Sequence, residues 1–237
     1  MENTDKYFIL NGEQIKVLSN ISLHVEKGER IAVLGPSGCG KSTILGLLAG
    51  FYKADKGNIH VEGKVSLMPQ QDMLLPWRKI LDNALLPLEL RGEKSSLAYQ
   101  KASELLPLFG LEGFGESYPN QLSGGMRQRA SLLRTYLNGG DFWLLDEPFG
   151  KLDTLTKEEL QLWLLDVWQT SQPGMVFVTH DIEEAIHLAH RIYLLSPRPG
   201  TIIHQFTVDW QKNDPQGEIK ALNLKQRIRE SLFLKNK

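Results

Sequence analysis

The fold of this chain is decided by the stretch Gly35-Pro36-Ser37-Gly38-Cys39-Gly40-Lys41-Ser42-Thr43, which fits the pattern G-x-x-x-x-G-K-[ST]. In such a loop, glycines let the backbone turn tightly, so that several N–H groups converge on the β-phosphate of a nucleotide. Lys41 supplies a positive charge for the β- and γ-phosphates, and Ser42 supplies a hydroxyl ligand for Mg²⁺. The apolar run 31–34 predicts a strand before the loop, and residues 43–50 predict a helix whose positive N-terminal end faces the anion. The sequence therefore predicts a nucleotide-binding loop between a strand and a helix.

Size and composition are those of an ordinary soluble protein. The 237 residues suffice for one large α/β domain, with or without a smaller insertion, and the net charge of -1 gives no electrostatic case for a nucleic-acid partner. The longest apolar stretch, 44–52, is far shorter than the roughly 18 residues that span a bilayer, and the N-terminus does not resemble a secretory signal. The one cysteine, Cys39, fits a reducing compartment. We expect a cytoplasmic protein without a nucleic-acid partner.

Strands and helices are expected to alternate along the chain. Strands are predicted at 15–18, 21–25, 59–61, 65–68, 142–145, 175–178, 192–195 and 202–208. Helices are predicted at 80–90, 97–109, 126–137, 156–170 and 181–190, with amphipathic spacing at 219–234. This order favours an α/β fold: a P-loop NTPase core with a mainly parallel sheet and an antiparallel β subdomain, plus an inserted helical subdomain.

The predicted organisation is a single nucleotide-binding domain over residues 1–237. Its core is expected at about 7–73 and 140–208, the helical subdomain at about 74–139, and a C-terminal tail at 209–237. The sequence leaves open whether this tail packs on the core or contacts a partner.

A second motif consists of an apolar strand, 142–145, that ends in the paired acids Asp146 and Glu147. In a P-loop protein, the first acid supports the Mg²⁺ that Ser42 also holds. The second is placed to polarise a water for attack on the γ-phosphate. Taken alone, such a pair can also be a solvated turn.

A third motif is the Ser-Gly-Gly turn at the start of a predicted helix, within residues 122–129. A helix start exposes N–H groups and positive potential, although most such turns bind nothing. One chain thus holds two anion-binding helix ends where one suffices for the phosphates. The second could serve a nucleotide held by another copy of the protein.

Together these stretches resemble the ABC ATPases: residues 35–43 look like the Walker A motif, 122–129 like the signature motif and 144–148 like Walker B. The order and spacing match over about residues 7–205. The family pattern also implies a glutamine, a histidine and a D-loop aspartate, which in this sequence are Gln70, His180 and Asp153.

The resemblance implies a homodimer that clamps two ATP molecules head to tail, with the loop from one copy and Ser123 and Gly125 from the other. It implies Glu147, His180 and Gln70 as catalytic residues, and Ser42, Gln70 and Asp146 around Mg²⁺. Nucleotide contacts would come from Phe8, Gly35, Pro36, Ser37, Gly38, Cys39, Gly40, Lys41, Ser42, Thr43, Ser123, Gly125 and Asp153. Phe8 is the candidate for stacking on adenine, with Tyr7 as the alternative. A thiol adduct on Cys39 should obstruct the nucleotide, so ATP is expected to shield it.

Residues 75–92 and 195–200 look more specifically like the nitrate/sulfonate/taurine branch of importer ATPases, and Met126 suits that branch. This implies integral membrane permease subunits as partners, an extracytoplasmic solute-binding protein indirectly, and a peripheral place on the cytoplasmic face of the cell membrane. Residues 73–77 could dock a short permease helix. Lys151 departs from the small residue usual in the D-loop.

Three alternatives stay open on the sequence. The solute could be another small compound, such as a thiamin-precursor pyrimidine, in place of nitrate, a sulfonate or taurine. The chain could be a soluble ABC ATPase of DNA repair or translation, although it lacks their coiled-coil insertions and tandem domains. A small-molecule kinase could use the same loop, but residues 122–129 would have no role there.

Overall fold

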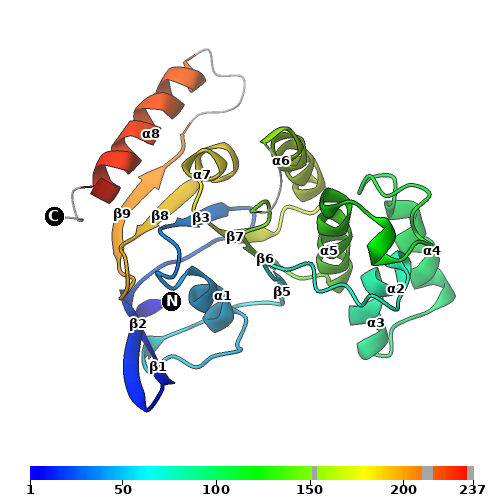
Figure 1. The fold of residues 1–237 in the computed structure, drawn as a ribbon, viewed down its shortest axis with the longest axis horizontal. Coiled ribbons are helices and arrows are strands. Elements are labelled where there is room, and N and C mark those ends of the chain that lie inside the picture. The colour runs from blue at the N-terminus through cyan, green and yellow to red at the C-terminus, as the bar shows by residue number, and fades with distance from the viewer. Residues whose placement is uncertain (151–153, 210–215, 234–237) are drawn as a thin grey trace. The chain divides into compact units, whose positions relative to one another are not determined.

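The computed structural model describes residues 1–150, 154–209 and 216–233 (Figure 1). Its contacts divide the chain into two compact units: the first is Met1–Glu62 with Gly174–Lys237, and the second is Gly63–Pro173. Among the described residues, none of the helices combines the length and apolar character needed to cross a membrane.

The first unit begins with an antiparallel hairpin, in which β1 (Glu2–Leu10) pairs with β2 (Glu13–Ile21). Asn11 and Gly12 form the turn with φ of 52° and 84°, values that Asn and Gly adopt more readily than other residues. β4 (Lys56–Asn58) pairs with the other edge of β1, so the small sheet has the order β2-β1-β4. This is the predicted antiparallel β part of the fold.

A parallel sheet forms the core of the first unit. β3 (Arg30–Leu34) lies between β7 (Gly174–Thr179) and β8 (Arg191–Leu195), parallel to both, and β9 (Ile202–Thr207) adds to β8 in the antiparallel direction. Every residue of β7 is buried, as expected for a central strand of a parallel sheet. The helices α1 (Lys41–Leu48) and α7 (Ile182–Leu188) pack against these strands.

The C-terminal helix α8 (Gly217–Phe233) packs on α7 in the same unit, beside β9 (Figure 1). Leu224 and Ile228 bury one face of α8, and the Arg227 guanidinium lies 5.5 Å from the ring centroid of Phe206 on β9. Lys225 pairs with Glu183 on α7. The sequence left open whether the tail packs on the core or contacts a partner, and in the structure α8 packs on the core.

The second unit combines a parallel strand pair with most of the helices. β5 (Val65–Met68) pairs with β6 (Phe142–Asp146). The helices are α2 (Ile80–Ala84), α3 (Leu86–Leu90), α4 (Ser96–Leu105), the 3₁₀ turn η1 (Pro119–Gln121), α5 (Gly124–Asn138) and α6 (Thr154–Gln169). The predicted α/β class is confirmed, with parallel and antiparallel strands and an added group of helices. The boundaries proposed for core, helical subdomain and tail stay predictions.

Several predicted elements are wrong in extent. The strand predicted at 21–25 ends at Ile21, and beyond it Leu23 enters the core from an irregular segment. The strand predicted at 59–61 is absent, and the segment that pairs is β4, which ends directly before residue 59. The helix predicted at 80–90 is two short helices, since Pro87 lacks the N–H that a continuous helix needs.

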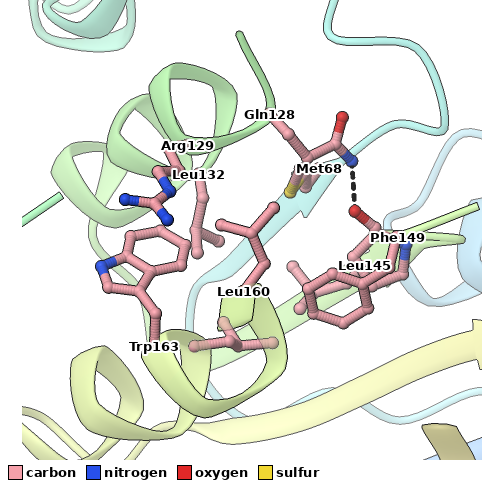
Figure 2. Close-up of a pocket in the computed structure, with 10 residues that line it drawn as sticks. Met68, Gln128, Arg129, Leu132, Leu145, Phe149, Leu160 and Trp163 are labelled. Atoms are coloured by element: carbon pink, nitrogen blue, oxygen red, sulfur yellow. Dashed lines mark hydrogen bonds between the residues drawn. The ribbon is translucent and has the colours of Figure 1, made fainter. Parts of the chain in front are cut away.

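A small void lies between α5, α6 and the end of β6 in the second unit. Its volume is about 10 Å³, close to the size of one water molecule, and Leu132, Leu160 and Trp163 are among the side chains around it (Figure 2). The void is too small for a nucleotide or a solute. Figure 2 also shows the Gln128 amide donating a hydrogen bond to the Pro148 carbonyl, which ties α5 to the segment after β6.

Candidate nucleotide-binding site

The predicted phosphate loop lies between β3 and α1 in the first unit. Gly38 and Gly40 have φ of 76° and 110°, which a residue with a Cβ rarely adopts. A Cβ on Gly40 would lie 2.6 Å from Cδ2 of Leu18, so the contact with β2 also requires glycine here. Gly40 is the N-cap of α1, and the N–H groups of a first helical turn point toward the helix N-terminus, which here is the loop. This arrangement is suited to binding a phosphate group.

The Lys41 side chain folds back onto the first residues of its own loop. Its ammonium donates to the carbonyl of Gly35 at 2.9 Å and to that of Pro36 at 3.0 Å, and the residue is 5% exposed. Ser42 and Ser37 are exposed, and Thr43 is half-buried. A cation held this way is in place to contact the outer phosphates of a nucleotide.

Cys39 corrects an expectation drawn from the sequence. The residue is 1% exposed, and its Sγ points at Gly35, where an added Cβ would lie 3.0 Å from it. Burial raises the pKa of the Cys39 thiol, with nearby Lys41 acting in the opposite direction. The thiol is therefore already shielded by the protein itself, before any nucleotide binds.

His180 lies at the same edge of the parallel sheet as the phosphate loop. It follows β7 directly and is exposed, while Thr179, the last residue of β7, pairs with Leu34 at the end of β3. The turn is fixed by Thr179, whose hydroxyl donates to Glu184 at 2.9 Å and accepts from the Asp181 N–H at 3.0 Å. The structure thus brings together the loop and His180, which are about 140 residues apart in sequence.

Phe8 and Tyr7 point in opposite directions from β1. Phe8 contacts the ring of Tyr52 edge to face at 5.2 Å, and Tyr52 in turn fills the space beside Gly46 on α1. Tyr7 instead faces the Lys16 ammonium, 5.4 Å from its ring centroid. Phe8 is therefore the one of the two that lies towards the helix after the phosphate loop.

The acidic residues of the second motif lie at the end of β6, in the second unit. Asp146 is the last residue of the strand, and Glu147 follows with φ of 44°, a left-handed conformation that is unusual for glutamate. Gln70 lies beside it, and its amide donates to Glu147 Oε2 at 2.9 Å. The structure thus brings together two predicted catalytic residues that the sequence separates by 77 positions.

The Ser-Gly-Gly turn begins α5, as predicted. Ser123 is the N-cap, and its hydroxyl accepts from the Met126 N–H at 3.3 Å. Ser123 is exposed and Gly125 is half-buried, so this helix start is open to an anion. The phosphate loop, Phe8 and His180 belong to the first unit, and Gln70, Asp146, Glu147, Ser123 and Gly125 belong to the second.

One group of side chains around this motif was missed on the sequence. Arg127 forms an ion pair with Asp72 at 3.1 Å, and Arg134 donates to the carbonyls of Asp72 and Met73 at 2.6 and 2.8 Å. The segment after Gln70 is therefore held by α5. Asp72 and Arg127 are 55 residues apart, so no local sequence pattern could have indicated this pair. Two predicted D-loop positions, Lys151 and Asp153, lie outside the described residues.

The strand, loop and helix of the first unit, with the acid-ended strand of the second, define a nucleotide-binding protein of the P-loop class. Residues 18–150 match the family model described as ABC transporter. The chain belongs to the ABC transporter family, whose members are ATP-hydrolysing cassettes.

Its relatives include three importer subunits from bacteria. The taurine import ATP-binding protein TauB of Pseudomonas aeruginosa is 40% identical, over 95% of this chain and 90% of TauB. The nitrate import ATP-binding protein NrtD of Synechocystis is 37% identical, over 99% of this chain and 91% of NrtD. The formylaminopyrimidine import ATP-binding protein ThiZ of Halalkalibacterium halodurans is 40% identical, over 91% of this chain and 86% of ThiZ.

A solved structure confirms the predicted fold. The dimeric structure of MJ0796, described as a bacterial ABC transporter cassette, has a TM-score of 0.78 and 30% identity, over 89% of this chain and 98% of that chain.

Proposed function

We propose that this chain is the ATP-hydrolysing subunit of an importer for a small solute, in which nitrate, a sulfonate or taurine is the cargo. The observation that carries the proposal is the near full-length similarity to the taurine and nitrate import proteins, combined with the phosphate loop and the Gln70–Glu147 pair. ThiZ, equally similar, supports a formylaminopyrimidine, a thiamin precursor, as the alternative cargo. An ATPase subunit is expected to contact the permease and not the cargo, so the cargo must be identified by experiment.

The nucleotide is proposed to bind along the loop of the first unit. The backbone N–H groups of the loop, which every residue of 35–43 except Pro36 has, and the Lys41 ammonium would contact its phosphates, and Phe8 would stack on the adenine. Ser42 and Asp146 supply oxygen donors of the kind that Mg²⁺ prefers, with Gln70 as a further ligand. When bound, Mg²⁺ would neutralise charge on the β- and γ-phosphates.

Glu147 is proposed as the general base for hydrolysis. It would take a proton from the attacking water, and Gln70, already bonded to its carboxylate, would orient that water. His180 would hold the γ-phosphate at the edge of the sheet where the loop begins. Gln70, Glu147 and His180 are polar or charged side chains that follow the ends of β5, β6 and β7, as expected of a site that works by positioning and electrostatics.

A complete site is proposed to need a second copy of the chain. Ser123 and Gly125 form an open anion-binding helix start that one copy does not need for its own nucleotide. MJ0796, which shares the fold, is a dimer in its solved structure. We therefore propose that Ser123 and Gly125 contact the nucleotide of a partner copy and that Asp153 couples the two sites, so that ATP holds two copies together until it is hydrolysed.

The partner in the membrane is proposed to be a pair of permease subunits, with this chain on their cytoplasmic face and a solute-binding protein acting outside. Exposed apolar side chains follow Gln70 directly: Met73 is 58% and Trp77 is 71% exposed. Such side chains suit the docking of a short permease helix.

The test is to purify the complex from membranes of the source cells by a tag on this chain, and to reconstitute it in vesicles. Nitrate, taurine, an alkanesulfonate and formylaminopyrimidine are then added with the co-purified binding protein. One of them should stimulate ATP hydrolysis several-fold, with the Lys41→Ala complex as the inactive control. The importer proposal is contradicted if the tagged chain never co-purifies with a membrane protein.

A further inference from the structure

The turn formed by residues 196–201 lies directly against Gly38 and Cys39 of the phosphate loop. The turn is closed on itself, because the Ser196 N–H donates to the Thr201 carbonyl at 2.9 Å and the Thr201 N–H donates to the Ser196 hydroxyl at 3.0 Å. It connects β8 to β9, and Leu195 at the end of β8 is fully buried. The turn is therefore anchored to the sheet that carries the phosphate loop.

Gly200 joins this turn to β2 by backbone hydrogen bonds and also lies close against the loop. Its N–H donates to the Val17 carbonyl, and its carbonyl accepts from the Ser19 N–H, both at 2.9 Å. A Cβ on Gly200 would lie 2.3 Å from the carbonyl oxygen of Cys39. The φ of Gly200 lies outside the left-handed region, so glycine is needed here for the close approach and not for a special backbone conformation.

Arg198 contacts the loop from the same turn. Its Nε donates to the carbonyl of Gly38 at 3.1 Å, across 160 residues of sequence. The carbonyl of Gly38 and the N–H of Cys39 belong to one planar peptide and point in opposite directions, and this N–H donates to the Pro36 carbonyl at 3.4 Å within the loop. A donor that holds the carbonyl therefore fixes where this N–H points, and the positive charge of the guanidinium also makes the N–H a stronger donor.

We propose that Arg198 is a positioning residue of the phosphate loop, which acts on the bound nucleotide through the Gly38 carbonyl. Gly200 sets the distance of the turn from the loop, and Arg198 sets the orientation of the 38–39 peptide. Neither residue belongs to the loop motif itself. The consequence is a loop that is held ready for the phosphates before the nucleotide arrives, so that less ordering is needed on binding.

The test compares Arg198→Ala, Arg198→Lys and a control, Arg229→Ala, which removes an exposed arginine from α8. Affinity for MgADP is measured by calorimetry, and KM and kcat for MgATP by steady-state kinetics. Arg198→Ala should weaken MgADP binding about three- to tenfold and raise KM with little change in kcat, as for the loss of one hydrogen bond that preorganises the loop. Arg198→Lys should recover most of the affinity, since an ammonium can donate to the same carbonyl.

Arg229→Ala should bind MgADP as the parent protein does, and all three variants should unfold at the parent's temperature without nucleotide. The proposal is overturned if Arg198→Ala keeps the parent affinity, if it lowers kcat while affinity is unchanged, or if lysine restores nothing. A loss of the same size in Arg229→Ala would also overturn it, because the effect would then be one of general surface charge.

Discussion

At the scale of single residues, Glu147 combines a strained backbone with a bonded carboxylate. A φ of 44° costs a non-glycine residue on the order of 1–3 kcal/mol, and such strain is commonly retained where function needs it. The Gln70 amide holds one carboxylate oxygen at 2.9 Å, which restricts the direction in which the other can accept a proton. Both observations support the proposed role of Glu147 as the base.

Glu147→Gln should therefore lower kcat for ATP by about two to four orders of magnitude, since the amide cannot accept the proton of the attacking water. ATP binding should persist, and dimers should accumulate on size-exclusion chromatography with MgATP. Glu158→Gln, which changes an exposed glutamate on α6, is the matched control and should keep the parent turnover. Full turnover in Glu147→Gln would remove this residue from the mechanism.

Cys39 gives a second prediction at this scale. Because the thiol is 1% exposed and burial raises its pKa, maleimide should react slowly with the folded protein, with or without MgATP. The reaction should become fast in denaturant, and its product is unambiguous because the chain has one cysteine. Fast labelling of the folded protein that MgATP suppresses would show instead that the thiol faces the nucleotide.

At the scale of elements, the junction between α7 and β8 carries a pH-sensitive contact. His190 Nδ1 accepts from the Arg30 backbone N–H at 3.2 Å, and the backbone N–H of His190 donates to the Arg30 carbonyl at 2.7 Å. Burial lowers the pKa of His190 below its ordinary 6.5, and the charge of Arg30 lowers it further. The neutral ring is thus the form that joins this junction to the first residue of β3.

A lowered pKa means that the unfolded chain binds more protons than the folded one once the pH falls below about 6.5. The contribution of His190 to stability should be complete above that pH and decline as the pH falls further. The variant His190→Asn keeps a hydrogen-bond acceptor at this position but does not titrate. The free energy of unfolding of this variant in urea should therefore fall less between pH 7.5 and 5.5 than that of the parent protein. Parallel pH profiles for the two proteins would contradict this contribution.

Contiguous sequence motifs predict helices and strands well. The exact ends of these elements are predicted poorly, because they depend on packing and on single residues such as proline. The phosphate loop, the acid-ended strand and the Ser-Gly-Gly helix start are each contiguous, and the structure has each one between the expected elements. The end of the strand at Ile21 and the break at Leu85 depend instead on which side chains the core accepts and on a proline.

At the scale of the whole molecule, the class of fold could be predicted because several motifs occur in one order. The long-range contacts that hold the motif segments could not be predicted. Arg127 meets Asp72 across 55 residues and Arg198 meets Gly38 across 160, and no periodicity in the sequence links such positions. The fold brings them together through sheet and helix packing, so only a structure shows that they support the motif residues.

The same scale yields a prediction about two copies, because the chain carries a phosphate loop and a second anion-binding helix start. Lys41→Ala should disable the loop, and Ser123→Arg should block the start of α5 with a bulky cation. Each variant alone should hydrolyse ATP close to background, since every site in its homodimer has one defective half. In a mixed dimer, the defects fall together in one site, and the other site combines an intact loop with an intact helix start.

An equal mixture of the two variants should therefore recover about a quarter of the parent activity, because half of the dimers are mixed and each of these has one intact site. The measurement is phosphate release against the mole fraction of one variant, which should rise to a maximum at equal amounts and fall on either side. Lys41→Ala mixed with a second variant of the same loop, Ser42→Ala, is the control and should stay inactive at every ratio. A flat profile for the first mixture would mean that each copy completes its own site, and would contradict the proposed exchange of Ser123 and Gly125 between copies.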